Sequence, residues 1–114
     1  MGKAAAKIPL LLEEKNFKSC PLPDIGHNFP AGYPAIYGLC IVADGRETVI
    51  FISCCEDLLP TVGEVLRRPA VAALKPTHLA ARYHPAATTD QWAARATETV
   101  RYRTKYQPLV RDRD

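Results

Sequence analysis

The chain has 114 residues, of which 47% are hydrophobic and 24% charged, and its formal net charge is +3. This length suits one domain with a single hydrophobic core, and the composition excludes a fibrous or largely disordered protein. No apolar run approaches the ~20 residues that a membrane-spanning helix needs, and the short run at residues 8–12 ends at two glutamates rather than at the cleavage pattern of a secretory signal. We therefore expect a cytoplasmic protein with no membrane partner.

The first 32 residues are predicted to form an irregular, proline-rich arm, and residues 33–114 the domain itself. Pro9, Pro21, Pro23 and Pro30 are too frequent for a helix or a central strand, because each proline removes a backbone donor. Residues 8–12, together with Phe17, leave room for one short strand at a sheet edge.

A β-hairpin is predicted to follow the arm. Residues 35–42 form a continuous apolar run that is typical of a buried strand, and residues 47–53 form a returning strand rich in β-branched side chains. Between them, Asp44 and Gly45 both tolerate the positive φ angle that a tight hairpin turn requires.

Two helices and a third strand complete the prediction. Residues 58–68 have helical apolar spacing and end before Pro69, and residues 78–83 read as a strand. Thr88 and Gln91 have the spacing of a capping box, which predicts a helix over residues 90–106. The predicted fold class is α+β, with a small antiparallel sheet (the hairpin plus the third strand) flanked by helices.

The last predicted helix contains an apolar stripe and most of the positive charge. Trp92, Ala96 and Val100 recur at spacing four and are expected to be buried. Residues 64–114 hold ten Lys or Arg against five Asp or Glu, whereas residues 1–63 hold five against seven. A basic helix of this kind is typical of a surface that follows a phosphate backbone, and also of a solvated helix with a charged tail. The residues expected to contact nucleic acid are Arg95, Arg101, Arg103 and Lys105.

The four cysteines are expected to be reduced and mostly buried. Cys20, Cys40, Cys54 and Cys55 include no CxxC pair, and the adjacent Cys54 and Cys55 point to opposite faces of any strand. This spacing offers no tetrahedral zinc site. A Cys40–Cys54 disulfide stays open as the alternative.

Two short motifs on the predicted hairpin resemble the signatures of the GIY-YIG nuclease family. Ala35-Ile36-Tyr37 matches the first signature with Ala in place of Gly, and Phe51-Ile52-Ser53 matches the second with Phe and Ser in place of Tyr and Gly. Glu98, on the last helix, stands where the family has its metal-binding glutamate. The resemblance covers about residues 33–110. Because the motifs are short, it depends mostly on the order of the motifs and on their spacing along the chain.

The resemblance implies metal-dependent hydrolysis of DNA phosphodiesters. In the family a strand tyrosine acts as base or positions water, a helix arginine neutralises developing charge, and a glutamate holds Mg²⁺ or Mn²⁺. Carried over, these roles fall on Tyr37 as the catalytic tyrosine, on Arg67 or Arg68 as the cation, and on Glu98 as the metal ligand. Thr61 occupies the position of the family arginine and has no charge.

Phe51 cannot form the hydrogen bonds of the family tyrosine, so the site is expected to have degenerated. A two-residue hairpin turn also places Phe51 on the opposite sheet face from Tyr37, whereas a bulge or a longer loop places both on one face. For Tyr37 a core position is the alternative interpretation, and for Glu98 a surface ion pair with Arg95 or Arg101.

Three functions are consistent with these observations. The first is a catalytically degenerate GIY-YIG-like domain that binds nucleic acid through its basic last helix, or binds a protein partner. The second is an active endonuclease dependent on Mg²⁺ or Mn²⁺. The third is a small interaction or structural module unrelated to nucleic acid. Of these, we expect the binding domain.

Overall fold

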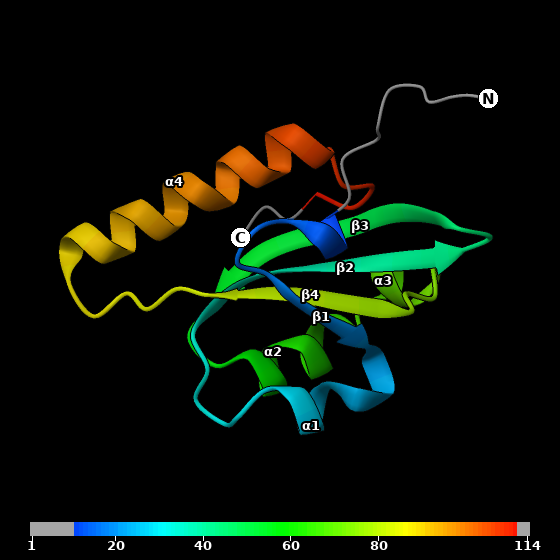
Figure 1. Cartoon of the computed structure of the whole chain (residues 1–114), viewed down its shortest axis with the longest axis horizontal. Coiled ribbons are helices and arrows are strands. Elements are labelled where there is room, and N and C mark those ends of the chain that lie inside the picture. Colours follow the sequence, from blue (N-terminus) through cyan, green and yellow to red (C-terminus); the bar gives the residue numbers. More distant parts are fainter. Residues whose placement is uncertain (1–10, 112–114) are drawn as a thin grey trace.

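The computed structural model describes residues 11–111, which form a four-stranded antiparallel sheet with helices on both faces (Figure 1). The strand order is β1-β4-β2-β3. The strands are β1 (Lys18–Pro21), β2 (Ala35–Ala43), β3 (Arg46–Cys55) and β4 (His78–Tyr83). The helices are η1 (Leu11–Glu13), η2 (Leu22–Asp24), α1 (Ile25–Asn28), α2 (Leu58–Val65), α3 (Pro69–Ala72) and α4 (Thr89–Tyr106). The predicted α+β class is confirmed, and β1 is an addition to the predicted strands.

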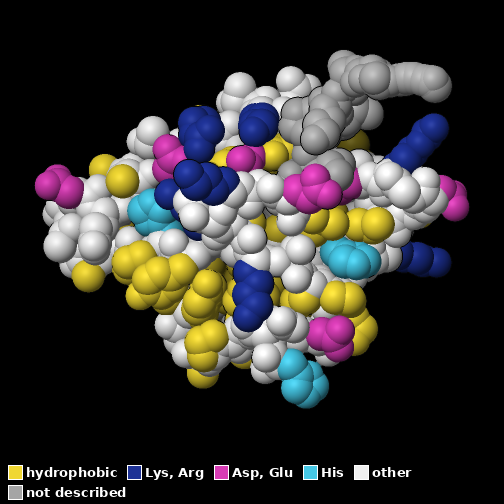
Figure 2. All heavy atoms as spheres, viewed as in Figure 1, with side chains coloured by type: hydrophobic (Ala, Val, Ile, Leu, Met, Phe, Trp, Pro, Cys, Tyr) yellow, Lys and Arg dark blue, Asp and Glu magenta, His cyan; other side chains and the backbone are white. Residues whose placement is uncertain are grey.

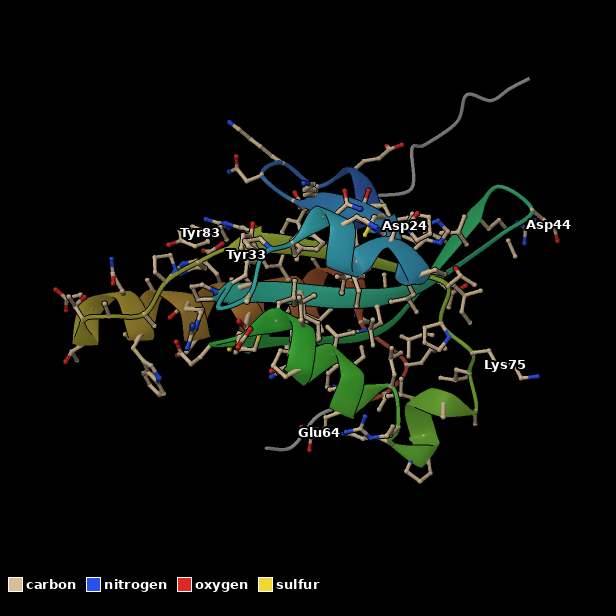
Figure 3. All side chains as sticks on the ribbon, turned by 90° about the horizontal axis from the view of Figure 1, so that it is seen from below. Asp24, Tyr33, Asp44, Glu64, Lys75 and Tyr83 are labelled. Atoms are coloured by element: carbon tan, nitrogen blue, oxygen red, sulfur yellow. The ribbon has the colours of Figure 1, made fainter. Side chains whose placement is uncertain are left out.

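The hairpin β2–β3 forms around the predicted turn. Asp44 and Gly45 have φ angles of 55° and 74°, and Ala43 pairs directly with Arg46. These angles are those of the tight turn whose twist matches that of the two strands. Figure 3 shows Asp44 at the tip of this hairpin, which extends beyond the rest of the sheet.

A β-bulge in β3 decides which side chains share a face. Cys40 pairs with Val49, but Leu39 pairs with Phe51, so Ile50 is an extra residue in β3. The extra residue reverses the alternation that the two-residue turn imposes. Tyr37 and Phe51 therefore lie on the same face of the sheet, with ring centroids 6.1 Å apart.

The hydrophobic core has two layers, one on each face of the sheet. One layer packs strand residues such as Tyr37 and Leu39 against Leu58 and Val62 of α2. The other contains Ile36, Cys40, Ile52, Ala80 and, from α4, Tyr102. Figure 1 shows the same division, with α2 on one side of the sheet and α4 on the other.

The predicted orientation of α4 is wrong. Trp92 and Val100 are 60% and 58% exposed, whereas the buried positions are Arg95, Thr99 and Tyr102. The aliphatic stem of Arg95 and the ring of Tyr102 supply apolar surface to the sheet, while their polar ends form hydrogen bonds. This side of the helix can therefore be buried. The capping box itself is present, because Gln91 N donates to Thr88 Oγ1. No helix among the described residues is long and apolar enough to cross a membrane.

The segment predicted as an irregular arm packs into the domain from residue 11 onward. β1 pairs with β4, and Cys20 and Phe29 are buried. Of the predicted edge strand, residues 8–10 lie outside the described residues, and Leu11–Glu13 is the 3₁₀ helix η1. A boundary at residue 32 therefore does not separate two structural units, because β1 contributes its backbone to the same sheet.

The four cysteines form no disulfide. Cys20, Cys40 and Cys55 are buried and Cys54 is half-buried, which confirms the expectation that the cysteines are mostly buried. Burial raises the pKa of the Cys55 thiol to about 11, because desolvation disfavours the thiolate.

Candidate functional site

Tyr37 lies in the core layer between the sheet and α2. Its side chain is only 1% exposed, and its ring lies beside that of Phe51. The position follows from β2 being a central strand whose two faces are both covered by helices. In this structure Tyr37 contacts protein rather than solvent.

Of the two candidate arginines, Arg68 is the one brought close to Phe51. The guanidinium of Arg68 lies 5.7 Å from the centre of the Phe51 ring, a cation–π geometry. The chain leaves the α-helix after Val65, and this turns Arg68 back toward the sheet. Arg67 is exposed.

Glu98 lies on the opposite side of the sheet, on α4. Its Oε1 accepts hydrogen bonds from Arg82 Nη1 at 3.3 Å and from Arg101 Nη2 at 2.7 Å. The hydrogen bond from Arg101 is the largest influence that lowers the pKa of Glu98, and the charge of Arg82 adds to it. Among residues 11–111, no three His, Cys, Asp or Glu side chains are close enough together to hold a metal ion.

The sheet separates the residues that the family resemblance assigned to one catalytic site. Tyr37, Phe51 and Arg68 gather on the α2 face, and Glu98 belongs to the α4 face. The structure therefore does not bring Tyr37 and Glu98 together. The surface ion pair between Glu98 and Arg101, the alternative interpretation of Glu98, is present.

Arg95 is buried and joins three parts of the fold. Its Nη1 donates to the carbonyl oxygens of Cys55 at 3.2 Å and His84 at 3.4 Å, and its Nη2 pairs with the carboxylate of Glu56. Only 4% of the residue is exposed. Arg95 was predicted to contact nucleic acid, and this burial removes it from that set.

Arg101 and Lys105 are exposed but paired with carboxylates. Arg101 binds Glu98, and Lys105 Nζ lies 2.9 Å from Glu14 Oε2. On the face drawn in Figure 2, basic side chains lie beside acidic ones in the upper part of the molecule, where α4 runs. These pairs reduce the positive charge that this side of α4 presents to a ligand.

Arg103 lies at the end of α4, against the outer edge of β3. Its Nε donates to the carbonyl oxygen of Ile52 at 2.8 Å, which holds the guanidinium in place. The two terminal nitrogens of Arg103 make no hydrogen bond to the described residues. Of the four predicted nucleic-acid contacts, only Arg103 has no carboxylate partner in the described chain.

The end of the described chain folds back and brings a second arginine to Arg103. Gln107 ends α4 with a left-handed φ of 48°, and Pro108 follows. The backbone N–H groups of Leu109 and Val110 then donate to the carbonyl oxygens of Val49 and Ile50, so this segment lies along the edge of β3. The turn carries Arg111 to the same region of the surface as Arg103.

Arg103 and Arg111 together line two adjoining surface hollows. One, of about 210 Å³, is lined by Arg103, Pro108, Val110 and Arg111. The other, of about 410 Å³, is lined by Val100, Arg103, Thr104, Gln107 and Arg111. No described carboxylate pairs with either arginine. We call these two hollows the arginine groove.

A cluster of aromatic residues, of which Tyr83 is exposed, lies at the end of β4. Tyr83 is 56% exposed, and its ring centroid lies 5.3 Å from that of Tyr33. Figure 3 shows these two labelled residues near each other. Tyr33 also contacts Phe29, whose ring lies under Lys18 Nζ. This cluster anchors the loop before β2 to the end of β4.

Sequence reasoning missed Arg82 and Arg111. Arg82 is two residues after Ala80 in β4, so the two side chains lie on the same face of the sheet. This period-two spacing is the signal that would have placed Arg82 under α4, where Glu98 lies. For Arg111 the sequence offers no comparable signal, because the turn at Gln107 and Pro108 that brings it to Arg103 has no strong local signature.

No protein-family model, no curated protein and no solved structure matches the chain in comparisons at a significant level. The similarity to GIY-YIG nucleases therefore stays a prediction.

Proposed function

We propose that this protein is a nucleic-acid-binding module and that the arginine groove holds the phosphate backbone of its ligand. The observation that supports this best is the pairing state of the basic residues in the C-terminal region. Arg95, Arg101 and Lys105 are each paired with a carboxylate, from Glu56, Glu98 and Glu14, whereas Arg103 and Arg111 line the two adjoining hollows and have no described carboxylate partner.

The chemistry of the groove suits phosphate. An arginine guanidinium presents several N–H donors in a fixed fork, which matches the oxygens of a phosphate group. The Ile52 carbonyl engages only Nε of Arg103, so the terminal nitrogens are left to bind a ligand. The hydrogen bond to Nε also restricts the Arg103 side chain before a ligand binds. Less side-chain conformational entropy is therefore lost on binding.

Salt dependence provides the main test. We would measure the anisotropy of labelled oligonucleotides with increasing protein at several salt concentrations. Binding is expected to weaken linearly on a log–log scale, and Arg111→Gln is expected to reduce the slope by about one, as is Arg103→Gln. Absence of salt-dependent binding to any oligonucleotide would overturn the proposal.

Arg101→Gln is the matched control. It removes the same charge from the same helix, but Arg101 is already paired with Glu98 and does not line the groove. Its salt slope is expected to stay close to that of the wild type. An equal loss in Arg101→Gln and Arg111→Gln would assign binding to net charge rather than to the groove.

A further inference from the structure

We infer that the ligand of the arginine groove is a single-stranded nucleic acid, and that Trp92 stacks on one of its bases. This inference rests on the proposed function and names the class of nucleic acid. The exposed side of α4 carries the apolar stripe that the sequence predicted to be buried.

The exposed stripe and the arginine groove are continuous. Residues 92, 96, 100 and 103 recur at spacings of four, four and three, so they share one side of α4. Val100 is 58% exposed and lines the larger hollow together with Arg103 and Arg111. The stripe therefore leads from Trp92 into the groove.

Trp92 is placed to offer an open aromatic face. It is 60% exposed, and its ring makes no contact with another described aromatic ring or cation. A large apolar side chain in this position loses the free energy of burial unless a ligand covers it. Asp90 lies two positions away and so does not share the side of Trp92.

The spacing along the helix fits a short run of nucleotides. Trp92 and Arg103 are eleven residues apart, which corresponds to about 16 Å along the helix axis. At the ~3.4 Å rise of stacked nucleotides, this distance equals about five nucleotides. Aromatic stacking beside a basic track is how proteins bind single strands without reading their sequence.

A single strand fits better than a duplex or a protein partner. The bases of a duplex are stacked on one another, so an intact duplex offers its phosphates to the groove but no base to Trp92. A protein partner would have to gain its affinity by burying the stripe, and the stripe offers little apolar surface. Its two large side chains are Trp92 and Val100, and Ala96 between them is half-buried. Arg103 and Arg111, at the end of the stripe, have no carboxylate partner among residues 11–111 and favour a ligand with repeated negative charge.

The single tryptophan of the chain gives a direct test. We would titrate the full chain with a ~12-nucleotide oligothymidylate and with a duplex of similar length, and record both oligonucleotide anisotropy and tryptophan fluorescence. The single strand is expected to bind and quench Trp92. The duplex is expected to bind more weakly and to leave Trp92 fluorescence nearly unchanged.

Two substitutions of Trp92 separate stacking from charge. Trp92→Ala is expected to weaken single-strand binding by about 5- to 150-fold, which is the usual range for a lost base–aromatic stack, and to leave duplex binding unchanged. Trp92→Phe keeps an aromatic face and is expected to retain most of the affinity. Circular dichroism and thermal melting check that both variants fold, as the exposure of Trp92 predicts.

The outcomes distinguish this inference from the proposed function. Salt-dependent binding of both oligonucleotides without quenching, or with an unchanged affinity in Trp92→Ala, would overturn the single-strand inference and leave the proposed function standing. Failure of both oligonucleotides to bind would overturn both. Displacement of the single strand by polyglutamate at equal affinity would assign the surface to an acidic protein partner and would also overturn the inference.

Discussion

Arg82 and Glu98 are joined across the interface between β4 and α4. Arg82 Nη1 lies 3.3 Å from Glu98 Oε1 and also donates to the hydroxyl of Tyr102 at 2.7 Å. Arg101 binds the same carboxylate oxygen from the solvent side. Glu98 therefore helps to attach the last helix to the sheet, and this role needs no metal ion.

The lowered pKa of Glu98 predicts how its contribution depends on pH. Because the folded pKa is below the ordinary 4.5, the stabilisation is present above that value and is lost as the pH falls through the folded pKa. We expect Glu98→Gln to be slightly less stable than the wild type at neutral pH, and the difference to vanish in acid. Urea unfolding across this pH range measures it, with Glu64→Gln, an exposed glutamate without a described ion pair, as control. A difference that grows in acid would contradict the assignment.

The nuclease alternative makes a separate prediction. Since the sheet separates Tyr37 from Glu98, we expect no nicking of plasmid or oligonucleotide DNA with Mg²⁺ or Mn²⁺ in either the wild type or Glu98→Ala. Cleavage by the wild type that disappears in Glu98→Ala would show that Glu98 acts in a metal-dependent site. That result would direct the search for the catalytic cation to Arg68, which lies over Phe51.

Gly38 is predicted to be sensitive to the addition of a side chain. A Cβ at this position in central strand β2 would lie 2.2 Å from Cδ2 of Leu11, which is itself buried. Gly38→Ala must displace Leu11 and is expected to lower the free energy of unfolding by about 1–3 kcal/mol. Gly26→Ala is the control, because a Cβ there meets nothing within 4 Å. Equal stability of the two variants in urea would show that η1 is not packed on β2 as described.

Arg95 is predicted to matter for folding rather than for ligand binding. Replacing it by Met keeps much of its apolar stem but leaves the carbonyl oxygens of Cys55 and His84 without this donor. We expect a loss of about 1–3 kcal/mol in the free energy of unfolding, measured in urea. Arg101→Met, at an exposed position, should change the stability by less than about 0.5 kcal/mol. Oligonucleotide affinity per folded molecule should be the same in Arg95→Met and the wild type, and a selective loss of affinity would refute the structural role.

Local chemistry made several elements predictable from the sequence. The Asp44-Gly45 turn and the Thr88–Gln91 capping box depend on backbone conformations and hydrogen bonds within a few residues, so they appear where the sequence places them. The strand at residues 78–83 matches β4 (His78–Tyr83). Helix α2 also begins where its apolar spacing begins, although it ends at Val65 rather than at residue 68.

The side chains that form the candidate site depended on contacts between distant segments. Burial of Arg95 requires carbonyl groups from the ends of β3 and β4, and the exposure of Trp92 follows from the way α4 lies on the sheet. The extra residue Ile50 in β3 determines that Tyr37 and Phe51 share a face. Periodicity within one helix or strand contains none of this information, because it does not tell which side of an element meets the rest of the fold.

For this protein the sequence alone therefore established the α+β class, the hairpin, the last helix and its basic character. The tertiary structure decided which basic residues are paired with carboxylates and which, Arg103 and Arg111, meet in the groove. The physical reason is range: turns and caps are local, whereas burial and ion pairing require the sheet, α4 and the returning segment after Pro108 to be assembled.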